Sequence, residues 1–349
     1  MKYVYTHFIP ENVAPKGATR IVFKRVNKEV CSIPAALFGD MAPPEGEPDC
    51  IFGLLSDSHI CPLNANGAMI SARMDAALTF FEEHGADFVA NCGDLVNSGF
   101  IIDKAKGYDP SEFVEYKRLR DRHPNLPMYG TVGNHDSYNA HIMSLEYADG
   151  DESQTYEDEL IEYTGHGVKF TVEHKGNLFI FIGNPKSSVL YIDGNTFSEV
   201  RWLESLLNNN RDKRCFVFMH PFLTDDSGNP LGKHKSPICP AAVIDSIIKN
   251  ALKNHGRAML FHGHAHFMPQ LQERDKTTNY TDKNGFPSVH VPSLAMAARL
   301  DENDEMEKTD TEGYGYLVEV YPDCIYLRGR DFVRNEWVGI GTYRIEVTA

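Results

Sequence analysis

The chain has 349 residues, of which 42% are hydrophobic and 24% charged, the proportions of an ordinary globular protein with a sizeable core. Its formal net charge is -15, which disfavours a nucleic acid as partner, because Lys and Arg supply most of the affinity for a phosphate backbone. The seven cysteines are scattered, as is typical of free thiols in a reducing compartment, and no apolar run has the length of a membrane helix. We therefore expect a cytoplasmic protein that does not enter the membrane.

The first 49 residues differ from those that follow. Residues 20–26 have the pattern of a strand, residues 30–33 offer it a hairpin partner, and residues 41–48 are rich in Pro and Gly. A segment this short is too small to bury a core of its own. We expect residues 1–49 to form a small β appendage and a connector, and residues 50–349 to form the main domain.

From residue 50 onward, strand-like and helix-like segments alternate, as in α/β proteins. Residues 51–55 form a short apolar run, which is typical of a strand buried on both faces. Further strands are expected at 87–92, 128–132, 169–173, 178–182, 215–219, 258–261, 316–320, 324–329 and 342–347. Helices are expected at 68–84, 111–121, 156–163, 198–208 and 240–254. The acidic segment 301–310 is interpreted as a solvated loop.

Five short motifs that contain metal-binding side chains each follow one of these strand-like runs. They are Asp57-Ser58-His59, Gly93-Asp94, Gly133-Asn134-His135-Asp136, His220-Pro221 and Gly263-His264-Ala265-His266. In Asp-x-His and His-x-His the two side chains stand at positions i and i+2, so they can face one ion from an extended segment. Ligands bind at the carboxyl ends of strands in open α/β sheets. Asp, Asn and His together suit two divalent or trivalent ions, and such a pair is used to split phosphate esters.

The ordered set of motifs resembles the calcineurin-like metallophosphoesterase superfamily, over residues 50 to 270. The resemblance implies a metallo-dependent phosphatase fold of the α/β class, a four-layer αββα sandwich of two mixed β-sheets flanked by helices. It also implies two metal ions, whose identity (Mn, Fe or Zn) the sequence leaves open. The first ion would be held by Asp57, His59, Asp94 and His266. The second would be held by Asp94, Asn134, His220 and His264, with Asp94 bridging the two.

Two cations about 3.5–4 Å apart lower the pKa of a bridging water, so that hydroxide forms near neutral pH and attacks phosphorus. The resemblance makes His135 the general acid for the departing alkoxide. Asp136 either orients that imidazole or caps the loop. Asn97 either contacts the substrate phosphate or stabilises its loop. His234 lies in the loop after His220 and is either a phosphate contact or mobile surface charge.

The sequence differs from two related subfamilies at single positions, and these differences narrow the range of expected functions. Purple acid phosphatases carry a tyrosine where this chain has Asn97, and protein Ser/Thr phosphatases carry an arginine where it has Val132. We therefore expect a bacterial-type binuclear phosphoesterase that hydrolyses a phosphodiester, such as a cyclic nucleotide or another small soluble phosphate ester. The alternatives are a phosphomonoesterase of the same superfamily, and a non-catalytic metal-binding scaffold that acts through partners. The sequence leaves the oligomeric state open.

Overall fold

The computed structural model describes residues 43–97, 111–136, 156–183, 194–224, 242–273, 279–301 and 306–346. Most of the expected appendage lies outside the described residues, as does His234. The division of the chain into residues 1–49 and 50–349 therefore stays a prediction. No described helix combines the length and the apolarity that a membrane crossing requires, and the five described cysteines are free and buried.

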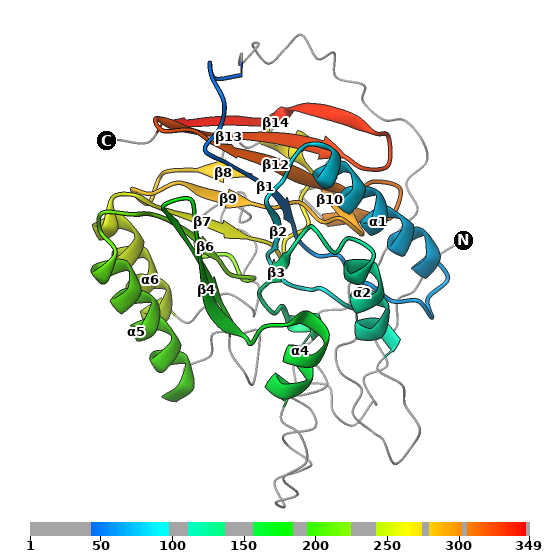
Figure 1. Ribbon diagram of the computed structural model, residues 1–349, viewed down its shortest axis with the longest axis horizontal. Coiled ribbons are helices and arrows are strands. Elements are labelled where there is room, and N and C mark those ends of the chain that lie inside the picture. The colour runs from blue at the N-terminus through cyan, green and yellow to red at the C-terminus, as the bar shows by residue number, and fades with distance from the viewer. Residues whose placement is uncertain are drawn as a thin grey trace, which may run out of the picture.

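Two six-stranded sheets form the centre of the fold (Figure 1). The first has the order β14-β13-β12-β1-β2-β3, with bounds Glu336–Glu346, Cys324–Asp331, Tyr314–Val320, Cys50–Leu55, Phe88–Asn91 and Met128–Gly130. The second has the order β4-β5-β6-β7-β9-β8, with bounds Lys169–His174, Asn177–Ile182, Arg214–Phe218, Ala258–His262, Ser288–His290 and Tyr280–Thr281. Both sheets are mixed, because β1 pairs parallel with β2 but antiparallel with β12, and β5 pairs parallel with β6 but antiparallel with β4.

Helices cover the outer face of each sheet, which gives four layers (Figure 1). The first sheet is covered by α1 (Gly67–Glu83), α2 (Ser111–Asp121) and α4 (Tyr156–Thr164), and the second by α5 (Gly194–Asn209) and α6 (Ala242–His255). All five expected helices are present, and Gly85 follows the first with φ 71°, the left-handed conformation of a helix C-terminal cap. The expected four-layer α/β sandwich is confirmed.

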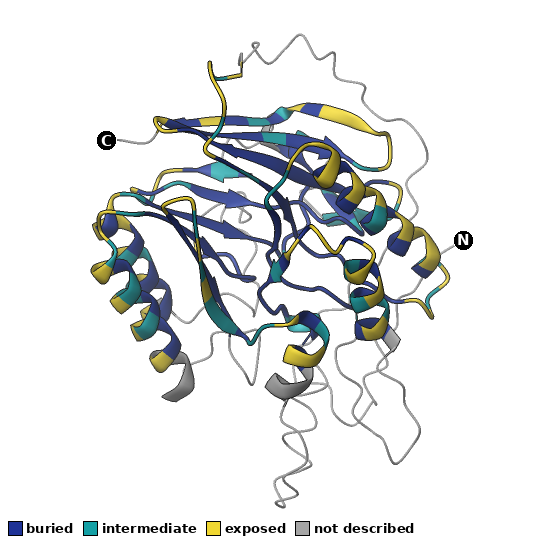
Figure 2. Cartoon of the chain, viewed as in Figure 1, coloured by how far each residue is buried: buried dark blue, intermediate teal, exposed yellow. Residues whose placement is uncertain are grey.

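An aromatic cluster fills the space between the sheets. Phe52 of β1 is fully buried, and its ring centroid lies 5.3 Å from that of Phe88 and 5.5 Å from that of Phe179. The outward faces of the helices are exposed, whereas the central strands of both sheets are buried and the edge strands β4 and β14 are partly exposed (Figure 2). Because close-packed interiors deform little, the strand ends above this core form a rigid base for loops.

Four short strands in the C-terminal third were not expected from the sequence. Two of them, β10 (Ala297–Leu300) and β11 (Met306–Thr309), pair antiparallel as a separate hairpin. The interpretation of residues 301–310 as a solvated loop is therefore wrong in part, because residues 306–310 are half-buried. Strands of two to four residues are too short for a periodic pattern, so tertiary packing decides whether they form.

Candidate metal centre

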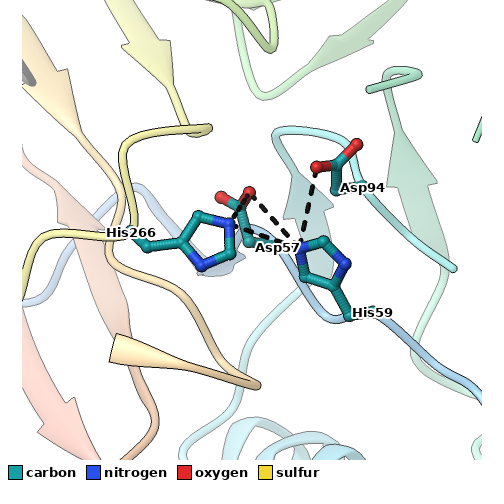
Figure 3. A group of neighbouring side chains, drawn as sticks. All are labelled: Asp57, His59, Asp94 and His266. Carbon is teal, nitrogen blue, oxygen red and sulfur yellow. Dashed lines mark hydrogen bonds and ion pairs between the residues drawn. The ribbon is translucent and has the colours of Figure 1, made fainter. Parts of the chain in front are cut away.

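The five motifs converge at the carboxyl ends of β1, β2, β3, β6 and β7. One potential ligand atom from each of Asp57, His59, Asp94 and His266 lies within 4.8 Å of the others (Figure 3). A second group with the same spacing contains Asp94, His220 and His264. Asp94 thus belongs to both groups, as expected of a carboxylate that bridges two ions.

A backbone carbonyl determines which nitrogen of His266 faces the centre. His266 Nδ1 lies 2.8 Å from the carbonyl oxygen of Met296, and since that oxygen only accepts, Nδ1 donates. A neutral ring then keeps a lone pair on Nε2, which lies 2.9 Å from Asp57 Oδ1 and 3.2 Å from His59 Nε2. Asp57 Oδ1 is buried and has no hydrogen-bond partner. Converging acceptor atoms of this kind suit a cation between them.

His220 repeats the arrangement in the second group. Its Nδ1 donates to the carbonyl oxygen of Cys92 at 2.8 Å, so a neutral ring presents the lone pair of Nε2. That atom lies 3.0 Å from Asn134 Oδ1 and 3.3 Å from Asp94 Oδ2. Three acceptor atoms again face one another, and without a cation the imidazole takes up a proton instead. The donor set of each group therefore fits a divalent ion.

Both carboxylates are held so that one oxygen remains for the centre. Asp57 Oδ2 accepts the hydroxyl of Ser56 at 2.6 Å and the backbone N–H of His264 at 3.0 Å. Asp94 Oδ1 accepts the backbone N–H of His135 at 2.8 Å. Burial would raise the pKa of Asp94, but the neighbouring His220 and His135 outweigh it and hold that pKa well below its usual range. The carboxylate is therefore ionised at neutral pH and can bind a cation.

The backbone is strained at the expected ligands. A positive φ is uncommon for residues other than glycine, and each such residue costs on the order of 1–3 kcal/mol. Among the described residues the structure has seven, and five are expected ligands: Asp57 (φ 51°), His59 (φ 43°), Asp94 (φ 50°), His264 (φ 70°) and His266 (φ 61°). Strain that gathers at one place in this way is characteristic of functional sites.

Two glycines of the motifs are required by close approach. A Cβ atom on Gly133 would overlap the carboxylate of Asp94, and one on Gly263 would overlap Ser56 Oγ and lie 2.6 Å from Asp57 Oδ2. Any larger residue would push these carboxylates away from the centre. The glycines in Gly-Asn-His-Asp and Gly-His-x-His thus let neighbouring loops close around the ligands.

His135 lies beside the first group of ligands. Its ring centroid is 4.6 Å from that of His59, and its Nδ1 is 2.6 Å from the backbone carbonyl oxygen of Asn97. Since the carbonyl only accepts, Nδ1 carries a proton, and Nε2 is the ring atom left to exchange a proton with a ligand. Asn97 contributes its backbone here, and the expected contact of its side chain with a substrate phosphate stays a prediction.

Asp136 makes contacts other than those expected of a partner for His135. Its carboxylate accepts the backbone N–H of Val96 at 3.0 Å and that of Gly133 at 2.7 Å. Of the two interpretations offered by the sequence, these contacts fit loop capping. The orientation of the His135 ring comes instead from the carbonyl of Asn97, because the carboxylate is committed to the loop.

Arg73 supports the centre from α1 and was missed by the sequence analysis. Its side chain is 5% exposed, and its guanidinium donates to the carbonyl oxygens of Leu294 and Ala295 at 2.9 and 2.8 Å. The N–H groups of Leu294 and Ala295 donate in turn to the carbonyl oxygens of Ser56 and Asp57. Arg73 thus fixes the loop that carries Asp57. In a sequence, an arginine in a helix that supports a buried loop looks the same as an arginine on an exposed helix surface.

A further group of potential ligands, Cys50, Asp87 and His174, lies at the opposite ends of the strands. Asp87 accepts the backbone N–H of Ile51 at 3.1 Å, and Lys175 Nζ lies 2.9 Å from each of its oxygens. Burial raises the pKa of the Cys50 thiol to about 12. These contacts provide the Asp87 carboxylate with hydrogen-bond donors without an ion. We therefore interpret the group as a structural link between the two sheets.

Metal binding to the apoprotein is expected to release about one proton at pH 7 from His220. Burial lowers the pKa of His220, but Asp94 and Asp57 outweigh it and raise the pKa to about 9. The imidazolium therefore predominates below that pH and must lose its proton before Nε2 binds a cation. The apparent affinity at this site should rise about tenfold per pH unit up to about 9 and then level off.

Calorimetric titration in two buffers of different ionisation enthalpy at pH 7 measures the number of protons released. A heat of binding that does not depend on the buffer would contradict the expectation.

The chain is similar to a known protein family and to several solved structures. A family model described as calcineurin-like phosphoesterase matches residues 52–268. The fold is similar to that of a dimetal phosphatase from Danio rerio, with a TM-score of 0.55 at 13% identity, covering 86% of this chain and 100% of that one. YfcE, a phosphoesterase from E. coli, gives a TM-score of 0.38 at 11% identity, covering 85% of this chain and 100% of that one. No curated protein matches the chain.

Proposed function

The chain belongs to the calcineurin-like phosphoesterase family, and from this premise we propose that it is a binuclear metal-dependent phosphodiesterase acting on a small soluble phosphate ester. The observation that carries the proposal is the pair of ligand groups that share Asp94. The family and the ligand chemistry together support a metal-dependent phosphoesterase. The net charge of -15 favours a small substrate over a nucleic acid, because a strongly acidic protein repels a long phosphate backbone.

In this proposal each ion has four protein ligands. One ion would be held by Asp57, His59, Asp94 and His266, and the other by Asp94, Asn134, His220 and His264. Bound divalent ions would supply Lewis acidity toward the phosphoryl oxygens and lower the pKa of a water nucleophile. Mn, Fe and Zn all accept Asp, Asn and His ligands, so availability selects among them.

His135 supplies the proton that the departing oxygen needs. As an imidazolium it carries protons on both nitrogens, and the Nδ1 proton is held by the carbonyl of Asn97. Transfer of the Nε2 proton to the leaving oxygen then gives a neutral ring without breaking that hydrogen bond. General acid catalysis of this type contributes about 10²- to 10⁴-fold to a rate.

Hydrolysis of chromogenic esters by reconstituted protein tests the proposal. Apoprotein prepared with a chelator is expected to be inactive, and addition of Mn, Fe or Zn should restore hydrolysis of bis(p-nitrophenyl) phosphate. His220→Ala, which lacks a ligand of the second group, serves as the inactive control.

Faster hydrolysis of p-nitrophenyl phosphate would instead show a phosphomonoesterase. Hydrolysis of neither ester by metal-loaded protein would favour the non-catalytic scaffold. The presence of both ligand groups together with His135 supports catalysis over that alternative.

A further inference from the structure

The β10–β11 hairpin borders the metal centre. Lys308 of β11 pairs with Ala298 of β10. The N–H of Ala298 donates to the carbonyl oxygen of His266 at 2.7 Å, and Ala298 forms a parallel bridge with Phe267. Lys308 therefore stands one strand away from the segment that carries His266, within the reach of an extended lysine side chain.

The alternation of side chains along the hairpin turns Lys308 toward the ligand loops. Arg299 and Glu307 form an ion pair at 3.2 Å, and their side chains are 36% and 25% exposed, so they occupy the outer face. Successive residues of a strand point to opposite faces, which places Lys308 and its pair Ala298 on the inner face. Ala298 and its neighbour Ala297 are both fully buried, in a cluster that includes Ala265, the residue between two expected ligands.

The electrostatics of the centre agree with this placement. After burial, the charge of Lys308 is the largest cause that lowers the pKa of His266, and it also lowers the pKa of His264. Burial lowers the pKa of Lys308 to about 8, while the carboxylates of Asp57 and Asp94 favour its charged form. The side chain is therefore mainly a cation at pH 7.

A half-buried cation beside a centre for two metal ions does not favour the binding of metal, because like charges repel. Two divalent ions carry four positive charges, and the carboxylates of Asp57 and Asp94 offset only two of them. A further cation therefore strengthens the attraction of the centre for an anion. His135 adjoins His59, whereas Lys308 approaches from the strand beside His266. The two side chains would accordingly contact different oxygens of one phosphoryl group.

We propose that Lys308 binds a non-bridging phosphoryl oxygen of the substrate, an inference that rests on the proposed function. In this role it holds the phosphoryl group against the metal centre while His135 serves the leaving oxygen. An ammonium group beside the anionic phosphoryl group of a phosphodiester forms a charge-assisted hydrogen bond, which is stronger than a neutral one. Lys308 is thus a substrate-binding residue contributed by a hairpin that lies outside the five motifs.

Binding of inorganic phosphate to the metal-loaded protein tests this inference without relying on turnover. Lys308→Met removes the charge and keeps most of the length, Lys308→Gln keeps a polar end, and Lys308→Arg keeps the charge. Calorimetry should show phosphate affinity about 10- to 100-fold weaker in Lys308→Met and Lys308→Gln, the range for loss of a hydrogen bond to a charged group. Lys308→Arg should stay within about threefold of the unaltered protein. Lys117→Met, on the exposed side of α2, is the matched control and should leave phosphate affinity unchanged.

Elemental analysis of each variant separates the possible outcomes. Unchanged phosphate affinity in both neutral variants, with their metal content intact, would overturn the inference. Loss of metal from these variants would also overturn it, since Lys308 would then support the ligands and not the substrate. If phosphate binding depends on Lys308 but no ester is hydrolysed, the proposed function fails and the assignment of Lys308 as an anion-binding residue stands.

Discussion

Replacement of Asp94 by alanine is expected to lower hydrolytic activity by at least about 10⁴-fold, equivalent to about 5 kcal/mol of transition-state stabilisation. Asp94 Oδ2 lies 3.3 Å from His220 Nε2 and 3.6 Å from His59 Nε2, so its carboxylate faces both ligand groups. In the proposed binuclear site, a single substitution would therefore remove a ligand from both ions and also a negative charge that offsets their repulsion. No other described side chain belongs to both groups.

Activity, metal content and circular dichroism of the Asp94→Ala protein would be measured together. We expect a native spectrum with less metal and no turnover. Asp323→Ala is the matched control, because this carboxylate is 71% exposed and lies outside both ligand groups. Turnover in Asp94→Ala near that of the unaltered protein would count decisively against a shared carboxylate.

Replacement of His135 by alanine is expected to discriminate between substrates according to their leaving groups. Esters with alkyl leaving groups need a proton on the departing oxygen, so their hydrolysis should slow by about 10²- to 10⁴-fold. Activated aryl esters depart as stable phenolates, and their hydrolysis should slow by less than about tenfold. The metal content should stay unchanged, because His135 belongs to neither ligand group.

Measurement of kcat over a series of diesters with leaving groups of increasing pKa tests this role. The slope of log kcat against leaving-group pKa should become steeper in His135→Ala than in the unaltered protein. Equal losses for alkyl and aryl esters would refute the general-acid role and leave His135 as a positioning residue.

The candidate metal centre could be predicted from the sequence because its residues belong to short local motifs. Asp57 with His59, and His264 with His266, stand two residues apart directly after apolar strands. Both the spacing and the apolar strands can be read from the sequence alone. The strands themselves were visible because buried β1, β6 and β7 have continuous apolar runs. Parallel pairing of β1 with β2, and of β6 with β7, brings the carboxyl ends to one edge within each sheet. The packing of the two sheets against each other then brings these edges together.

Other features depend on contacts that leave no local signature. The backbone carbonyl of Asn97 orients the His135 ring. Every residue type carries such a carbonyl, so this contact cannot be read from the sequence. The neighbouring carboxylate of Asp136 is the partner that the sequence suggests. Strand β14 begins earlier than expected because Gly339 and Gly341 interrupt the apolar pattern at the irregular pairing with β13. Lys308 lies in an acidic segment whose strand forms only through pairing with β10.

Titration of apoprotein with Mn(II), followed by electron paramagnetic resonance, tests most directly whether two adjacent ions share Asp94. Ions about 3.5–4 Å apart are coupled through a shared ligand. We expect two tightly bound equivalents of Mn(II), an exchange-coupled signal that grows as the second equivalent binds, and loss of that signal in Asp94→Ala. Saturation at a single ion, or two ions whose spectra remain those of isolated Mn(II), would contradict it.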